Sequence, residues 1–87
     1  MIWQITLSTE SLDFLSRQTK ALRKRIDSKI KWLAAFDQPQ KITKPLRGQY
    51  EGMHRLRIGD VRVIVEYRTD QIVIFVFNIS FRGNAYN

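Results

Sequence analysis

The spacing of apolar residues predicts one strand and two helices in the first half of the chain. Apolar and β-branched residues alternate through "IWQITLS", which indicates a strand over residues 2–7. Ser8 or Thr9 then offers an N-cap for a short amphipathic helix through "SLDFLSRQ". Between residues 20 and 36, aliphatic side chains recur at intervals of four, four and three, the spacing of one helix face. They are Leu22, Ile26, Ile30 and Leu33.

The two helices are expected to form an αα-hairpin with one cationic face. Arg23, Lys24 and Lys31 lie opposite the aliphatic stripe, where charged side chains either stay solvated or meet a polyanion. Trp32 and Phe36 lie beside the stripe. We interpret these two rings as core or hairpin packing and not as groups that stack on nucleic-acid bases.

The second half alternates with a period of two, which predicts a β-meander. The segment "DQPQKITKPLRGQYEG" contains two prolines and two glycines and is expected to connect the halves. Three strand-like runs follow it, "MHRLRI", "DVRVIVEY" and "QIVIFVFNIS", joined by tight turns at 59–60 and 68–70. The last run is apolar on both faces, so we expect it to be a central strand.

This element order predicts an α+β fold in a single domain over residues 1–87. We expect a small, mostly antiparallel four-stranded sheet with the N-terminal αα-hairpin packed on one face, in the order strand-helix-helix-strand-strand-strand. The apolar fraction of 44% is enough for one core without a metal or disulfide.

The residue inventory excludes several classes of protein. The chain has no cysteine and one histidine, which rules out zinc ribbons, thiol nucleophiles and two-histidine ribonucleases. Phosphate-binding glycine loops and a serine hydrolase elbow are absent from the sequence, and no cofactor or metal is expected. The sequence has neither a signal peptide nor a long apolar run, so we expect a cytoplasmic protein without membrane contact.

The charge balance points to a polyanionic partner. Fifteen Lys and Arg residues against eight Asp and Glu residues give a net charge of +7, which indicates nucleic acid, although surplus lysine also keeps small proteins soluble. In the second half nearly every positively charged residue is an arginine, whose planar side chain suits bidentate phosphate contact. The strand period puts Arg55 and Arg57 on one face of their strand, opposite His54, Leu56 and Ile58.

If the strands are neighbours, four guanidinium groups converge on one sheet face near Tyr86. They belong to Arg55, Arg57, Arg62 and Arg82. A phosphodiester is the simplest counter-charge; the alternative is a set of separate surface arginines paired with Glu51, Asp60, Glu66 and Asp70. One reaction needs little more than such cations. The 2′-hydroxyl of RNA attacks its own 3′-phosphate while the protein aligns the bond and stabilises the phosphorane.

The stretch "KPLRGQYEGMHRLRIGDVRVIVEY", followed by "ISFRGNAY", resembles the RelE/ParE toxin superfamily, and within it the RelE-type mRNA interferases of type II toxin-antitoxin systems. The resemblance implies a ribosome-dependent endoribonuclease that cleaves translated mRNA. By this resemblance Arg55 and Arg57 bind phosphate and support deprotonation of the 2′-hydroxyl. Arg62 stabilises the transition state, Arg82 lies near the leaving oxygen, and Tyr86 stacks on the nucleotide.

Arginine stays charged and is a poor proton acceptor, so the general base remains open. His54 titrates near neutrality, but its alternation with Leu56 places it toward the core, and we expect a packed histidine. The resemblance also implies partners: a cognate antitoxin that wraps the toxin at a sheet edge or across the hairpin, the ribosome and mRNA, and operator DNA through the antitoxin complex. Two rivals stay open, a ParE-like toxin that poisons DNA gyrase and an inactive partner-binding domain.

Overall fold

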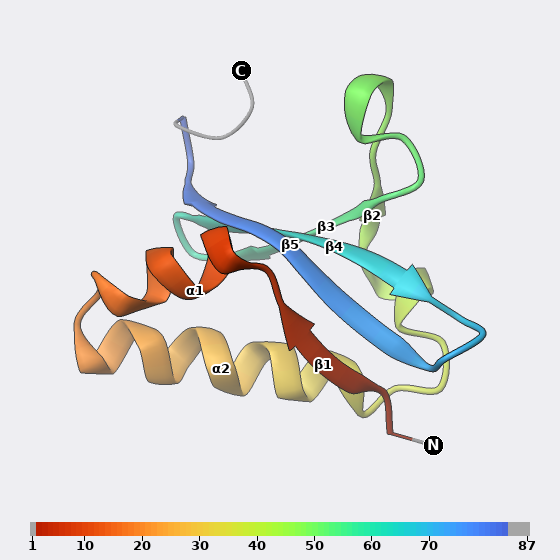
Figure 1. Cartoon of the computed structure of the whole chain (residues 1–87), viewed down its shortest axis with the longest axis horizontal. Helices are drawn as coiled ribbons and strands as arrows, with labels where there is room; N and C mark the ends of the chain where they lie inside the picture. Colours follow the sequence, from red (N-terminus) through yellow and green to blue (C-terminus); the bar gives the residue numbers. More distant parts are fainter. Residues whose placement is uncertain (1, 84–87) are drawn as a thin grey trace.

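The computed structural model describes residues 2–83, which form two layers: a mixed sheet and a pair of helices on one of its faces (Figure 1). In chain order the elements are β1 (Gln4–Leu7), α1 (Thr9–Ser16), α2 (Lys20–Ala34), the 3-10 helix η1 (Pro39–Ile42), β2 (Lys44–Pro45), the 3-10 helix η2 (Gly48–Tyr50), β3 (His54–Ile58), β4 (Val61–Arg68) and β5 (Val73–Phe81).

A hydroxyl residue caps each helix: Ser8, one of the two caps that the sequence offered for the first helix, and Thr19, which the sequence analysis did not identify. The Ser8 side chain accepts a hydrogen bond from the backbone N–H of Ser11, and the Thr19 side chain accepts one from that of Leu22. The helices α1 and α2 form the expected hairpin. The residues of α2 that face the sheet are Ile26, Ile30, Leu33 and Ala34, all buried.

The sheet has the order β1-β5-β4-β3-β2, so β5 lies inside the sheet, as its two apolar faces predicted. The strand β1 pairs with β5 in parallel, and the other three pairs are antiparallel. The expected four strands are wrong, because the connector supplies a fifth strand, β2. This strand has only two residues, one of them Pro45, and two residues carry no alternation that a sequence pattern could detect.

The core lies between the helices and the inner face of the sheet. Alternate residues of the strands supply Leu56, Val63 and Ile79 from neighbouring positions of β3, β4 and β5. The aromatic members of this core are Trp3 and Phe14, which are 7% and 6% exposed. The positions between them project from the outer face of the same strands, which carries arginines together with apolar residues such as Ile64.

The core placement of Trp32 and Phe36 is wrong. Their side chains are 45% and 38% exposed, and the rings contact each other with centroids 4.9 Å apart on the surface of α2. Successive helix positions are rotated by about 100°, so Trp32 points well away from the direction of Ile30, although it lies next to Leu33 in sequence. Within residues 2–83, no helix is long and apolar enough to cross a membrane.

Candidate nucleic-acid interface

The outer face of the sheet carries a row of polar residues across its three longest strands. Arg57 on β3 lies opposite Arg62 on β4, and Arg62 lies opposite Ser80 on β5. Residues that face each other across strands project from the same side of a sheet, and here that side is opposite to Leu56, Val63 and the helices. The pairing register therefore brings two of the predicted arginines side by side.

A second row follows along the strands. It runs across four strands, with Lys44 on β2 opposite Arg55 on β3. On the other side of Arg55, Ile64 on β4 is its partner, and Asn78 on β5 lies opposite Ile64. Arg55 thus shares the outer face with Arg57, as the strand period predicted. Lys44 joins the cluster only because β2 exists, and the sequence pattern did not identify it.

Arg82 lies at the end of this face that carries the β3–β4 turn. Its backbone N–H donates to the carbonyl of Asp60 at 2.6 Å, which joins the end of β5 to that turn. The structure therefore brings Arg57, Arg62 and the backbone of Arg82 to one end of the sheet, with Arg55 one step further along β3. Tyr86, the fifth predicted site residue, lies outside the described residues.

The four arginines differ in how far they are withdrawn from water. Arg57 and Arg82 are exposed, Arg55 and Arg62 are half-buried, and the Nε atom of Arg62 is buried. A guanidinium in a partly desolvated position interacts more strongly with an anion than one in bulk water. Arg55 and Arg62 therefore interact with a nearby anion more strongly than a fully exposed arginine does.

Carboxylates do not balance this face in the way that the alternative interpretation required. Among residues 2–83, Arg55, Arg57 and Arg82 form no ion pair, and the carboxylate of Glu66 contacts Arg68 at 2.9 Å. The separate-ion-pair alternative therefore fails for these three arginines. Like charges on neighbouring strands destabilise one another, so an anion bound here would stabilise the protein.

His54 faces the helices and not the arginines, in agreement with the packed histidine that the sequence indicated. Its Nδ1 lies 3.1 Å from the hydroxyl of Thr43, and that hydroxyl lies 2.8 Å from the hydroxyl of Tyr67. The hydroxyl of Tyr67 also donates to the carbonyl of Pro39 at 3.2 Å. Burial raises the pKa of the Tyr67 hydroxyl above its ordinary value, and the hydrogen bond with Thr43 opposes this effect. This cluster attaches η1 to β3 and β4.

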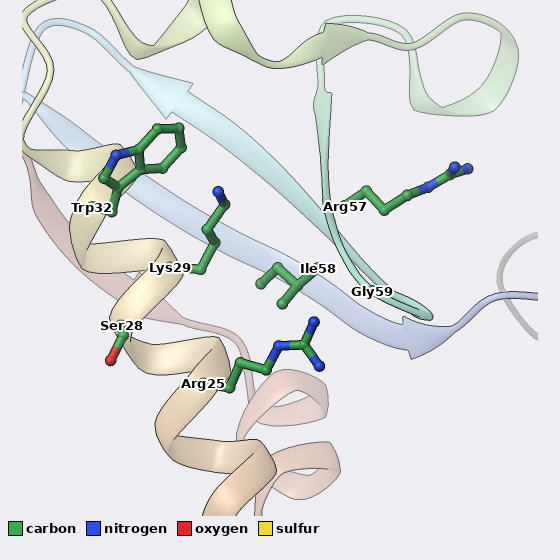
Figure 2. Close-up of a pocket in the computed structure, with 7 residues that line it drawn as sticks. All are labelled: Arg25, Ser28, Lys29, Trp32, Arg57, Ile58 and Gly59. Atoms are coloured by element: carbon green, nitrogen blue, oxygen red, sulfur yellow. The ribbon is translucent and has the colours of Figure 1, made fainter.

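A second cationic feature lies beside the outer face, between α2 and the free edge of β3. A cavity of about 420 Å³ is lined by Arg25, Lys29 and Trp32 of α2 together with Arg57, Ile58 and Gly59. Figure 2 shows Arg25 and Lys29 extending from α2 toward β3, while Arg57 points away from the helix toward the other side of the strand. Helix periodicity indicated a cationic surface on α2, but the partner strand of this groove depends on the tertiary fold.

The described residues contain no group of three or more His, Asp or Glu side chains arranged to hold a metal ion. The guanidinium groups of this interface can recognise an anion. Planar, bidentate contact suits a phosphate, and several such contacts at fixed spacing suit a phosphodiester backbone.

Comparison with protein families gives one match over most of the chain. Residues 8–86 match the family model described as "ParE toxin of type II toxin-antitoxin system, parDE". A comparison with curated protein sequences finds no match. Because the family model covers far more than half of the chain, it establishes membership in that family.

Solved structures of RelE toxins share the fold. The archaeal RelE in the RelE-RelB complex from Pyrococcus horikoshii OT3 superposes with a TM-score of 0.76 at 24% identity, covering 98% of this chain and 100% of that chain. A mutant of the E. coli toxin RelE in the free state gives a TM-score of 0.76 at 14% identity, covering 98% and 87%.

A third match is a chain of the toxin-antitoxin complex RelBE2 from Mycobacterium tuberculosis, with a TM-score of 0.71 at 19% identity, covering 94% of this chain and 100% of that one. Identities this low establish the fold alone. The family model establishes the kind of protein, and the solved structures agree with it in fold. The chain belongs to the ParE toxin family of type II toxin-antitoxin systems, within the RelE/ParE toxin superfamily.

Proposed function

We propose that this toxin is a ribosome-dependent endoribonuclease that cleaves translated mRNA. The observation that carries the proposal is the cross-strand row of Arg57 and Arg62 on the outer sheet face, beside Arg55; among residues 2–83, Arg55 and Arg57 form no ion pair. An RNA phosphodiester supplies the missing negative charge. It also brings its own nucleophile, the 2′-hydroxyl, so the protein need not provide one.

The proposed reaction is an in-line displacement at phosphorus. The 2′-hydroxyl loses its proton as its oxygen forms a bond to the phosphorus, and the bond from phosphorus to the 5′-oxygen breaks. The 5′-oxygen takes up a proton, so the products are a 2′,3′-cyclic phosphate and a 5′-hydroxyl. Arg55 and Arg57 bind the phosphate oxygens, and half-buried Arg62 stabilises the additional charge of the phosphorane. Arg82 contacts the leaving oxygen, and Tyr86 holds the base by stacking.

Proton transfer is the step of the reaction to which the residues of this face contribute least. Its described cations are arginines and Lys44, whose side chains are hydrogen-bond donors, and His54 is on the other side of the sheet. We therefore expect catalysis to depend on alignment of the substrate by the ribosome. Purified toxin should leave free RNA largely intact and cut the same transcript during translation.

The test is in vitro translation with mapping of transcript ends. Arg82→Ala should slow cleavage by about 10²–10³-fold, the scale for loss of one preorganised contact to a developing charge. Arg47→Ala is the matched control, because Arg47 is exposed and precedes η2, away from the β3–β4 turn. Efficient cutting of naked RNA, or equal loss in both variants, would contradict the proposal.

A second candidate is poisoning of DNA gyrase, favoured by the family model itself, whose description names ParE. The same translation reactions separate the two. A gyrase poison leaves transcript ends unchanged, yet it blocks supercoiling or traps cleaved DNA when it is added to gyrase and a relaxed plasmid. Gyrase inhibition without new transcript ends would replace the endoribonuclease proposal.

A further inference from the structure

The outer face of the sheet carries an aromatic pair some way along β5 from Arg82. The ring of Tyr50, in η2, contacts the ring of Phe77, on β5, with centroids 6.2 Å apart and the rings inclined at 67°. Because η2 rises on the side of the sheet opposite to the helices (Figure 1), this contact places the ring of Phe77 on the outer face. The side chain of Phe77 is 37% exposed, so part of an aromatic surface is open to a partner.

A β-bulge gives this part of β5 its chemistry. Val65 on β4 lies opposite Val76, but the preceding residue of β4, Ile64, lies opposite Asn78, so Phe77 is the extra residue. Val76 belongs to the core, whereas Ile64 is on the outer face. Phe77 and Asn78 therefore project from the outer face in succession, which the regular alternation of a strand does not allow.

The side chain of Asn78 is the polar neighbour of the Phe77 ring. It is half-buried, and its amide has no hydrogen-bond partner among residues 2–83. The amide offers both donors and an acceptor. In nucleic-acid recognition an asparagine amide pairs with adenine, because it donates to N7 of the base and accepts from the N6 amino group. An open ring face beside a free amide thus suits a base that stacks and hydrogen-bonds at once.

The cations of the outer face lie within one nucleotide of this pair of residues. Arg55 lies opposite Ile64, and Ile64 lies opposite Asn78. Two strand spacings, about 10 Å, therefore separate Arg55 from Asn78. A nucleotide spans a similar distance from its phosphate to the far edge of its base. A phosphate held by the arginines can accordingly have its base at Phe77 and Asn78.

We propose that Phe77 and Asn78 form a base-binding subsite that selects adenine in the nucleotide on the 5′ side of the cleaved bond. Its place in the reaction rests on the proposed endoribonuclease function. Arg82 is assigned to the leaving 5′-oxygen, which belongs to the nucleotide on the 3′ side. RNA that runs from Arg82 back along β5 toward Phe77 therefore leads in the 5′ direction. Phe77 stacks on the base, and Asn78 reads its edge.

The binding test uses a short 2′-O-methyl oligoadenylate, which has no 2′-hydroxyl to act as nucleophile, titrated into ¹⁵N-labelled toxin. We expect shifts of the side-chain amide of Asn78 and the backbone amide of Phe77. The matching 2′-O-methyl oligouridylate should bind about 10-fold more weakly, the scale of one bidentate pair. Asn78→Ala should bind both oligomers equally. Shifts confined to the arginines, with equal affinity of the wild type for both oligomers, would overturn the subsite.

Phe77→Leu separates stacking from packing. Leucine keeps an apolar contact with Tyr50 but has no flat face, so the affinity for oligoadenylate should fall about 10-fold, the scale of one lost stacking contact. Phe36→Leu is the matched control. Phe36 is 38% exposed and also contacts a ring, that of Trp32, but it follows α2 on the other side of the sheet. Undiminished binding by Phe77→Leu, or an equal loss in the control, would assign the Phe77 ring to packing alone.

Mapping of transcript ends during translation tests the place of the subsite in the reaction. Wild-type toxin should cut more often after adenine than Asn78→Ala does, while cuts after other bases persist in the variant. An unchanged distribution of ends would remove the subsite from the reaction. Because the oligomers cannot be cut, toxin that binds oligoadenylate through these residues but cuts no mRNA refutes the endoribonuclease proposal and leaves the base-binding site in place.

Discussion

Trp3 and Trp32 show how differently one residue type is used in this small protein. The ring of Trp3 lies in the core, contacts Tyr67 edge to face at 5.7 Å, and donates from its Nε1 to the carbonyl of Asp37. The ring of Trp32 lies on the surface, with the ammonium of Lys29 3.9 Å from its centroid. The first is a packing residue, and the second is available to a partner.

We therefore expect the two alanine variants to separate stability from binding. Trp3→Ala should lower the free energy of unfolding by about 3–5 kcal/mol, the cost of removing a buried aromatic side chain. Trp32→Ala should change it by less than about 1 kcal/mol, because the ring is nearly half exposed and the contacts that it loses, with Lys29 and Phe36, lie on the surface. Urea denaturation followed by circular dichroism measures both. A large loss of stability in Trp32→Ala would contradict the surface position of that ring and indicate that it is part of the core.

At the scale of elements, the important connection is the one that attaches the η1–β2 connector to the sheet. Buried Thr43 precedes β2 and contacts His54 at the start of β3 and Tyr67 on β4. These side-chain contacts help to hold Lys44 opposite Arg55. Lys44 is the first residue of β2, so β2 pairs with β3 at His54 and Arg55 and leaves the rest of that β3 edge without a β2 partner. The polar cluster on the helix side thus supports the arrangement of cations on the outer face.

Tyr67→Phe tests this connection and has a defined pH dependence. At neutral pH the variant should be less stable by about 0.5–1.5 kcal/mol, because the hydrogen bonds of the Tyr67 hydroxyl with Thr43 and Pro39 are lost. The raised pKa of Tyr67 means that the folded state retains the proton more tightly than the unfolded state. This stabilisation is complete below the ordinary pKa of 10.0 and is lost as the pH rises through the raised value.

The stability difference between wild type and Tyr67→Phe should consequently shrink above about pH 10. Denaturation curves at neutral and alkaline pH measure it, and comparison with the variant cancels the contributions that the two proteins share. A difference that grows with pH would contradict the raised pKa.

At the scale of the whole molecule, the core and the candidate site occupy opposite faces of one sheet. The helices cover the inner face, while η2 and the end of β5 rise on the other side (Figure 1). The hydrophobic cluster, the helices α1 and α2 and the strand pairs described above are formed by residues 2–83. Stability and site chemistry are therefore supplied by different residues of the same strands.

Removal of residues 84–87, which include Tyr86, should separate these two properties. We expect the truncated chain to keep its melting temperature within a few degrees, because all described packing remains. Cleavage during translation should fall by roughly 10- to 100-fold if Tyr86 contributes a base-stacking interaction of about 1–3 kcal/mol. Tyr86→Phe, which keeps the ring, should retain most of the activity. A truncated toxin with full activity would exclude the tail from the site.

The sequence by itself determined the order of the two helices and of four of the five strands, the hairpin, the central position of the last strand and the faces of β3. These features are local: the periods of 3.6 and 2 and the capping residues act over a few neighbouring positions. The same periodicity correctly placed Arg55 and Arg57 opposite Leu56 and directed His54 toward the helices.

Only the tertiary structure decided the rest. Whether Arg57 meets Arg62 depends on the register between β3 and β4, and the two-residue strand that brings Lys44 to Arg55 has no pattern of its own. The exposure of Trp32 likewise depends on which side of α2 the sheet covers. Register, strand pairing and burial are set by contacts between residues far apart in the chain, and a pattern read along the chain contains no such distances.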